Sequence, residues 1–238
     1  MKQFPIVLAS LLSILVLGCG SDAQPTTHNL SMVVDKTEGS QVTHSAYFAL
    51  KTLKKTPLYD GMNLRLTTIS DTRYNQTQRF VMDTGATGWL ANDHQRRTAR
   101  RVLLKHFKDS LDVLNNRQQS YTRSEVFRLV VSELNVLASA TGNRKLVLIS
   151  DLKENSSFFS VYTPNQLRLL NRNLEGATSL FEANASLVED LSGITVEIIY
   201  QPTLKDDALF ARLVLLYQSI LEPRGAIVRV GNQNTINL

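Results

Sequence analysis

Cysteines, clustered histidines and glycine-rich loops are almost absent from this sequence. Its 238 residues include one cysteine, Cys19, which excludes a disulfide within the chain. The four histidines are scattered and share no metal-ligand spacing; they are His28, His44, His94 and His106. Neither standard glycine-rich phosphate loop occurs, and there is no nucleophile elbow. The sequence therefore carries no signature of a disulfide scaffold, a histidine metal centre or a nucleotide site.

Long hydrophobic runs are also scarce, and the longest is too short to cross a bilayer comfortably. Residues 4–17 are almost wholly apolar, about 14 residues where a transmembrane helix needs about 20. After the basic start at Lys2, this length is typical of the hydrophobic region of a secretory signal peptide. Val16-Leu17-Gly18-Cys19 then resembles the bacterial lipobox, in which the cysteine is lipidated.

This resemblance implies that residues 1–18 are a lipoprotein signal peptide and that Cys19 becomes the mature, lipidated N-terminus. An ordinary signal peptide, or a buried free cysteine, is the alternative. Gly20 in place of aspartate favours the outer membrane, by analogy with enterobacterial sorting. Residues 19–28 are polar and lack periodicity, which predicts a tether. We therefore expect a lipid-anchored protein of the cell envelope.

The composition of the remaining chain favours one folded domain over residues 29–238. Hydrophobic residues make up 43% of the sequence and charged residues 20%, which argues against wholesale disorder. The net charge of +5 permits an acidic partner without requiring one.

Expected strands and helices alternate along this domain, and no internal repeat interrupts them. Strands are expected at residues 30–35, 62–70, 78–82, 145–150, 195–200 and 226–230. Helices are expected at 40–55, within 90–116, from a capping box at 122–125 to about 140, in two stretches punctuated by Pro164 and Gly176 that end near 192, and at 206–221. This order predicts an α/β fold with a doubly wound, mostly parallel, Rossmann-like sheet covered by helices on both faces.

Two acidic residues follow the two most apolar strands. Asp35 ends the strand at 30–35, and Asp151 follows the strand at 145–150. In doubly wound sheets these strands flank the crevice where the strand order reverses, so both acids are expected in one site. The alternative is that each aspartate simply caps the helix that follows it.

The surroundings of these acids resemble the metal-ion-dependent adhesion site of the von Willebrand factor A family. Asp35-Lys-Thr37-Glu-Gly39-Ser40 is similar to its Asp-x-Ser-x-Ser motif, although Gly39 holds the second hydroxyl position and Ser40 comes one residue late. Ser150-Asp151-Leu-Lys-Glu-Asn-Ser is similar to the last motif of some bacterial members, and the element order agrees over residues 29–231. The resemblance implies a vWA-like domain that binds Mg²⁺ or Mn²⁺ and leaves one position open for an acidic group on a protein partner. The implied ligands are Asp35, Thr37, Ser40, Thr87 (or Thr84) and Asp151.

Two enzyme interpretations compete with a binding module. Asp83-Thr84-Gly85-Ala86 resembles the signature of aspartic proteases, which with a single motif would require a homodimer and a nearly all-β fold. Val34-Asp35-Lys36-Thr37 is similar to the nucleophile motif of haloacid-dehalogenase-type phosphotransfer enzymes, but their acidic loop is missing. We therefore expect a binding or assembly protein and no catalytic residues.

Basic residues gather along the helix expected within 90–116. They are Arg96, Arg97, Arg100, Arg101, Lys105 and Lys108. The simple interpretation is a solvated helix face; the functional one is contact with an anionic surface such as lipid headgroups. Nucleic acid is not an expected partner, because aromatic side chains do not alternate with the charges.

Overall fold

The computed structural model describes residues 24–36, 44–69, 75–87, 91–116, 123–200 and 202–231. Within these residues the strands are β1 (Thr27–Asp35), β2 (Gly61–Ile69), β3 (Thr77–Met82), β4 (Asn143–Ile149), β5 (Ile194–Ile199) and β6 (Ile227–Gly231). The helices are α1 (His44–Leu53), α2 (Asp93–Asn116), α3 (Val126–Ala138), α4 (Pro164–Arg172), α5 (Leu174–Ala183) and α6 (Asp207–Leu221), followed by a 3₁₀ turn at Glu222–Arg224.

The strands form one sheet in the order β3-β2-β1-β4-β5-β6. Every neighbouring pair is parallel except β2 and β3, which are antiparallel. The predicted doubly wound, mostly parallel α/β fold is therefore confirmed. The chain leaves β1 toward one edge of the sheet and resumes at β4 toward the other, so the strand order reverses between β1 and β4.

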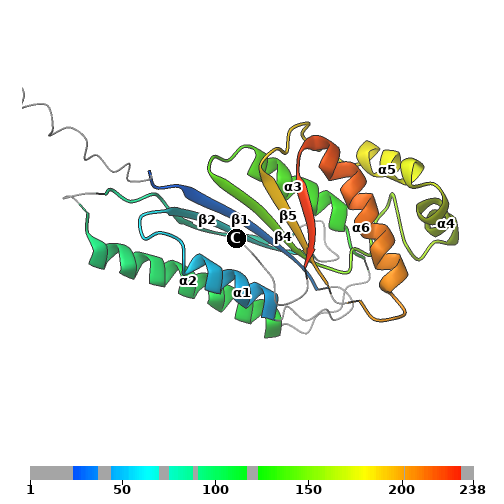
Figure 1. Ribbon diagram of the computed structural model, residues 1–238. Helices are drawn as coiled ribbons and strands as arrows, with labels where there is room; N and C mark the ends of the chain where they lie inside the picture. The colour runs from blue at the N-terminus through cyan, green and yellow to red at the C-terminus, as the bar shows by residue number, and fades with distance from the viewer. Residues whose placement is uncertain are drawn as a thin grey trace, which may run out of the picture.

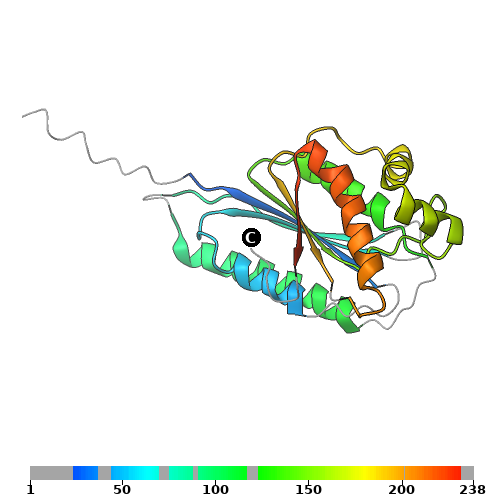
Figure 2. The same ribbon diagram turned by 45° about the vertical axis from the view of Figure 1, so that its right-hand side comes forward.

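Helices cover both faces of this sheet, α1 and α2 on one side and α3 to α6 on the other (Figures 1 and 2). Successive residues of β1 point to opposite faces and feed two separate cores. Met32 and Val34 pack with Phe107 of α2, whereas Val33 packs with the α3 and α6 side, which includes Tyr217. β1 is thus buried on both faces, which is why residues 30–34 are apolar except for the buried Ser31. None of the described helices is long and apolar enough to cross a membrane.

The first strand begins earlier than predicted. β1 starts at Thr27, two residues inside the segment expected to be the tether. The start is held by the turn before β2, because Thr26 N donates to Asp60 Oδ1 at 3.1 Å and Gly61 N donates to Thr26 O at 3.0 Å. Folded structure therefore reaches to within seven residues of Cys19.

Two helix predictions need correction. The stretch expected to end near residue 192 ends at Ala183, and Gly176 lies in the first turn of α5, where its N–H donates to Asn173 Oδ1 at 2.9 Å. The capping box expected at 122–125 does not cap α3 through Glu125, which makes no side-chain cap hydrogen bond. Glu154 provides the cap instead, since its Oε2 accepts the N–H of Phe127 at 2.9 Å.

Candidate functional site

The carboxyl ends of β1 and β4 meet at one edge of the sheet. The two strands are parallel neighbours with Val34 opposite Ile149. The next residues are therefore Asp35 and Ser150, and Asp151 follows one position later. The prediction that the strands preceding the two acids are adjacent and parallel is confirmed.

Asp35 is a buried carboxylate held by β4. Its side chain is 1% exposed, and Ser150 Oγ donates to its Oδ2 at 2.7 Å. Ser150 Oγ also accepts the N–H of Leu152 at 2.9 Å. Leu152 is buried and has φ of 63°, a left-handed conformation that is rare outside glycine. The hydroxyl of Ser150 thus joins the end of β1 to a strained turn that contains Asp151.

Asp151 is half-buried and shares a lysine with a second acid. Its Oδ1 accepts the N–H of Lys153 at 3.0 Å, and its Oδ2 lies 3.2 Å from Lys153 Nζ. The same Nζ lies 3.5 Å from Asp206 Oδ1 at the start of α6. A hydrogen bond from Thr203, with the Lys153 charge, holds the pKa of Asp206 below its ordinary value. A lysine ammonium therefore stands between two carboxylates at the rim of the site.

Several polar atoms below this rim are buried without a hydrogen-bond partner in the described part of the chain. They are Ser124 Oγ, Glu154 Oε1 and the Tyr217 hydroxyl. Burial raises the pKa of Glu154 to about 7, against the opposing hydrogen bond from the Phe127 amide. Burial, and then the charges of Glu154 and Asp35, raise the pKa of Tyr217. Orphaned oxygens of this kind mark a place where a small polar ligand could be accommodated.

Ser124 is a site residue that the sequence analysis missed. It lies just before α3, and its backbone pairs with Asn155 through N–H···O contacts of 3.3 and 2.9 Å. This pairing places Ser124 beside the segment that follows β4, at the same edge as Asp35. Ser124 therefore offers a buried hydroxyl near this end of the sheet, where Thr87 does not.

The assignment of Thr87 to this site is wrong. β3 is antiparallel to β2 and returns to its start, with Met82 opposite Met62. A Cβ on Gly61 would lie 3.0 Å from Thr84 N, so Thr84 and the segment after it lie where β1 begins. Eight strand residues, about 26 Å at 3.3 Å each, separate that end from Asp35. Thr37 and Ser40, the other two predicted hydroxyl ligands, lie outside the described residues.

The oxygen donors at this end of the sheet are of the type that a hard divalent cation binds. Among the described residues no group of three or more His, Cys, Asp or Glu side chains could hold a metal. The available donors are two carboxylates, Asp35 and Asp151, and the orphaned hydroxyl of Ser124. Mg²⁺ is commonly bound by one or two carboxylates and retains several waters, so a sparse oxygen set is compatible with it. The Lys153 ammonium at Asp151 is a competitor for the same carboxylate.

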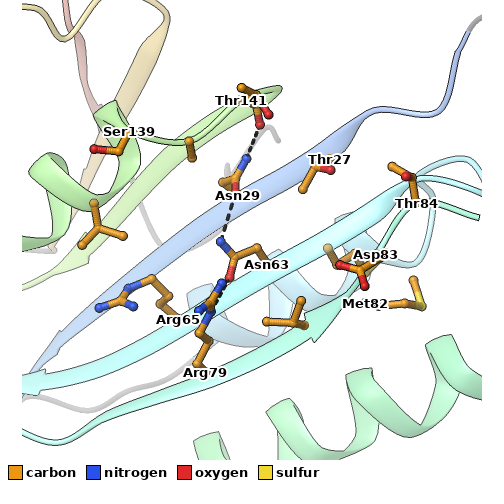
Figure 3. Close-up of a pocket in the computed structure, with 14 residues that line it drawn as sticks. Thr27, Asn29, Asn63, Arg65, Arg79, Met82, Asp83, Thr84, Ser139 and Thr141 are labelled. Atoms are coloured by element: carbon orange, nitrogen blue, oxygen red, sulfur yellow. Dashed lines mark hydrogen bonds between the residues drawn. The ribbon is translucent and has the colours of Figure 1, made fainter.

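A polar groove of ≈ 490 Å³ lies at the other end of the strands, where β1 begins, and is shown in Figure 3. Asn29 links Thr141 to Asn63, and Asn63 accepts a hydrogen bond from Arg79 at 3.0 Å (Figure 3). Asp83 lines this groove and is the one acid among the described residues that do so.

Neither enzyme interpretation agrees with these positions. The protease interpretation required a nearly all-β fold, whereas Asp83 is followed by the 24-residue helix α2 in an α/β domain. The phosphotransfer interpretation required an acidic loop of the Gly-Asp-x-x-x-Asp type, whereas the segment after β4 reads Ser150-Asp-Leu-Lys-Glu154.

No protein-family model matches the sequence, and neither does any curated protein. Solved structures with some likeness include the human COPII-coat protein Sec24c, at 10% identity and a TM-score of 0.41 over 90% of this chain and 30% of that one. Proximal thread matrix protein 1 from the mussel byssus gives 10% identity and 0.41 over 89% and 43%. The pilus adhesin SpaC from Lactobacillus rhamnosus GG gives 11% and 0.45 over 87% and 28%. This chain thus spans less than half the length of each.

Proposed function

We propose that this protein is a lipid-anchored binding module of the cell envelope, whose sheet edge binds a protein partner through a divalent cation. The observation that carries the proposal is the placement of Asp35 and Asp151 at the ends of adjacent parallel strands, where the strand order reverses. Doubly wound sheets bind their ligands in this crevice. The resemblance of both motifs to the von Willebrand factor A family supports the same site.

The proposed cation is Mg²⁺ or Mn²⁺, and its ligands come from three segments. Asp35 and Asp151 supply carboxylates, and Ser124 supplies a hydroxyl. Thr37 and Ser40 are retained as ligands on the sequence resemblance alone, and Thr87 is excluded. A bound divalent ion would attract an acidic side chain of the partner and would give the site its selectivity for such a group.

Lys153 sets how strongly the site can hold that ion. Its ammonium neutralises Asp151 and Asp206 at 3.2 and 3.5 Å, so a cation must displace it or share the Asp151 carboxylate with it. We therefore expect weak binding in the millimolar range. Removing the lysine charge should strengthen binding.

Thermal unfolding in the presence of Mg²⁺ or Mn²⁺ tests the metal site. A ligand that binds only the native state at about 100 times its Kd stabilises it by about 2.7 kcal/mol, so Tm should rise with metal. Asp151→Asn should abolish this rise, and Lys153→Gln should shift it to lower metal concentration. Thr87→Ala is the matched control, since Thr87 lies at the opposite edge and its loss should change nothing. An unchanged Tm of the unsubstituted protein at about 100 mM metal, roughly 100 times a millimolar Kd, contradicts the proposal.

The anchor is tested separately from the metal. Intact mass of the protein isolated from bacterial membranes should show a chain that begins at an acylated Cys19. Cys19→Ser should leave the domain folded but unacylated. If the mass shows a mature chain without lipid, the proposed anchor is wrong. The metal site is tested independently by the metal titration.

A further inference from the structure

A groove between α1 and α2 is lined almost entirely by cations and leucines. Its volume is ≈ 590 Å³. The two helices that line it cover the sheet face opposite α3 to α6 (Figures 1 and 2). No acidic side chain is among its described lining residues. They are Leu50, Lys54, Leu58, Arg97, Arg100, Arg101, Leu104, Lys105 and Lys108. Since the whole sequence has 26 basic and 21 acidic residues, this gathering of one sign is a local property.

Two arginines of α2 build the groove rather than face a ligand. Arg100 Nη2 donates to Leu53 O at 2.5 Å, and the same nitrogen contacts the Thr56 hydroxyl. Arg96 Nη2 donates to Asp60 O at 2.7 Å. Burial lowers the pKa of both arginines. Because their hydrogen bonds hold the end of α1 and the following turn against α2, these two side chains fix the width of the groove.

The five other cations form an accessible rim, and we call them the rim cations: Lys54, Arg97, Arg101, Lys105 and Lys108. Lys54 and Arg101 have no ion-pair partner in the described part of the chain. The other three are exposed and pair along the helix with Asp93, Asp109 and Asp112 at 3.4, 2.7 and 2.6 Å. Exposed ion pairs of this kind contribute little to stability, so an anionic ligand can replace the aspartate as the partner of each cation.

The groove starts near the amino end of α2 and runs along the helix from Arg97 to Lys108. β1 and α2 begin at the same end of the sheet (Figure 1). Asp60 joins them, because its side chain accepts Thr26 N at 3.1 Å and His28 Nε2 at 2.7 Å while its carbonyl accepts Arg96. Six residues lie between Cys19 and Thr26, and the seven steps from one to the other span at most about 25 Å of extended chain. A lipid on Cys19 would therefore keep the first turns of α2 close to the bilayer.

We propose that the α1–α2 groove binds the phosphate headgroups of anionic phospholipids in the leaflet that holds the Cys19 lipid. The rim cations supply the charge complementarity, and Leu50, Leu58 and Leu104 give the floor an apolar surface for the glycerol region. Stable membrane attachment usually needs one acyl chain plus a basic patch or a second chain, and the groove would act as that second contact. The inference rests on the proposed function only in using the anchor to bring the groove to the membrane.

Amine labelling of the full-length protein in vesicles tests this contact. The protein is reconstituted in phosphatidylcholine alone, or with about a third phosphatidylglycerol, and labelled with an amine-reactive ester. Labelling of Lys54, Lys105 and Lys108 should slow about fivefold in the anionic vesicles. Lys205, exposed at the opposite end of the sheet, should label equally in both. Protection should vanish near 1 M salt, where the Debye length is about 3 Å.

Charge variants separate lipid binding from a change in the fold. Arg101→Gln with Lys105→Gln should abolish protection of Lys54 and Lys108, with Tm unchanged because neither side chain is buried. Lys205→Gln, the matched control, should keep it. Equal labelling in the two vesicles overturns the proposal, as does protection by duplex DNA but not by the anionic vesicles.

The groove can also be tested if Cys19 carries no lipid. Sedimentation of the full chain with the same two vesicles then replaces labelling. Salt-sensitive binding to the phosphatidylglycerol vesicles alone supports the groove although the anchor has failed. Equal sedimentation with both overturns the groove as well.

Discussion

Ser150 Oγ lies 2.7 Å from Asp35 Oδ2 and also accepts the N–H of Leu152 at 2.9 Å. One hydroxyl therefore holds the last residue of β1, the turn after β4, and through that turn the position of Asp151. The arrangement is buried, so water cannot replace either hydrogen bond without a change in structure.

We expect Ser150→Ala to destabilise the fold by about 2 kcal/mol, because it leaves the Asp35 carboxylate and the Leu152 amide without this partner. Urea unfolding measures the change. Ser139→Ala, which removes an exposed hydroxyl from the end of α3, should stay within about 0.5 kcal/mol. Equal stabilities for the two variants would show that the Ser150 hydrogen bonds do not hold the turn.

Leu152 should invert the usual order of alanine and glycine. Its side chain is 0% exposed, so truncation costs about 2–5 kcal/mol, but its φ of 63° costs any non-glycine residue about 1–2 kcal/mol. Leu152→Gly relieves that strain and Leu152→Ala does not, so the glycine variant should be the more stable of the two. At Leu148, buried within β4, glycine should be the less stable by about 1 kcal/mol. Denaturant midpoints of the four variants decide the matter.

The central strands were predictable because burial on both faces leaves a plain record in the sequence. The runs that end at Asp35 and Ser150 are mostly apolar because neither face of these strands meets solvent. They are expected to pair because they are the first and fourth strands of a doubly wound sheet. The boundaries of α5 were not predictable in this way, since Gly176 is tolerated in its first turn through the Asn173 cap.

Thr87 lies far from Asp35 because β3 runs antiparallel to β2. Seven residues, 70–76, separate β2 from β3. A parallel crossover needs a dozen or more, so this spacing already requires an antiparallel strand. The short connection therefore already predicts that Thr87 lies near the start of β1. It also predicts that α2 leads back toward Asp35, with Ser124 following it.

Glu133 and Arg65 form a buried ion pair that should dominate the acid sensitivity of the α3 interface. Glu133 accepts from Arg65 at 2.7 and 3.0 Å, from Ser31 at 2.6 Å and from Thr67 at 3.1 Å. Burial alone would raise the pKa of Glu133, but these hydrogen bonds bring it below its ordinary value. A lowered folded-state pKa stabilises the fold above the unfolded pKa, and that stability is lost as pH falls through the folded value.

Arg65→Met should therefore destabilise the protein by about 3–5 kcal/mol at pH 7, because the Glu133 carboxylate stays buried without its cation. The variant should also lose less further stability on acidification than the unsubstituted protein. Chemical unfolding at neutral and acid pH measures both effects. Arg79→Met removes an exposed guanidinium that bonds Asn63, and it should leave stability nearly unchanged at both pH values.

Glu154 should give the fold a pH dependence of the opposite sign. Burial raises its pKa to about 7 from an ordinary 4.5, and the Glu125 carboxylate and the Tyr217 hydroxyl are its acidic neighbours. A raised folded-state pKa contributes stability that is complete below about 4.5 and is lost as pH rises through about 7. A rise of the pKa from 4.5 to about 7 corresponds to an upper bound of about 3 kcal/mol. Glu154→Gln keeps an acceptor for the Phe127 amide but cannot ionise. Its stability relative to the unsubstituted protein should therefore increase between pH 5 and 8, and parallel pH curves would show that Glu154 does not titrate in the folded protein.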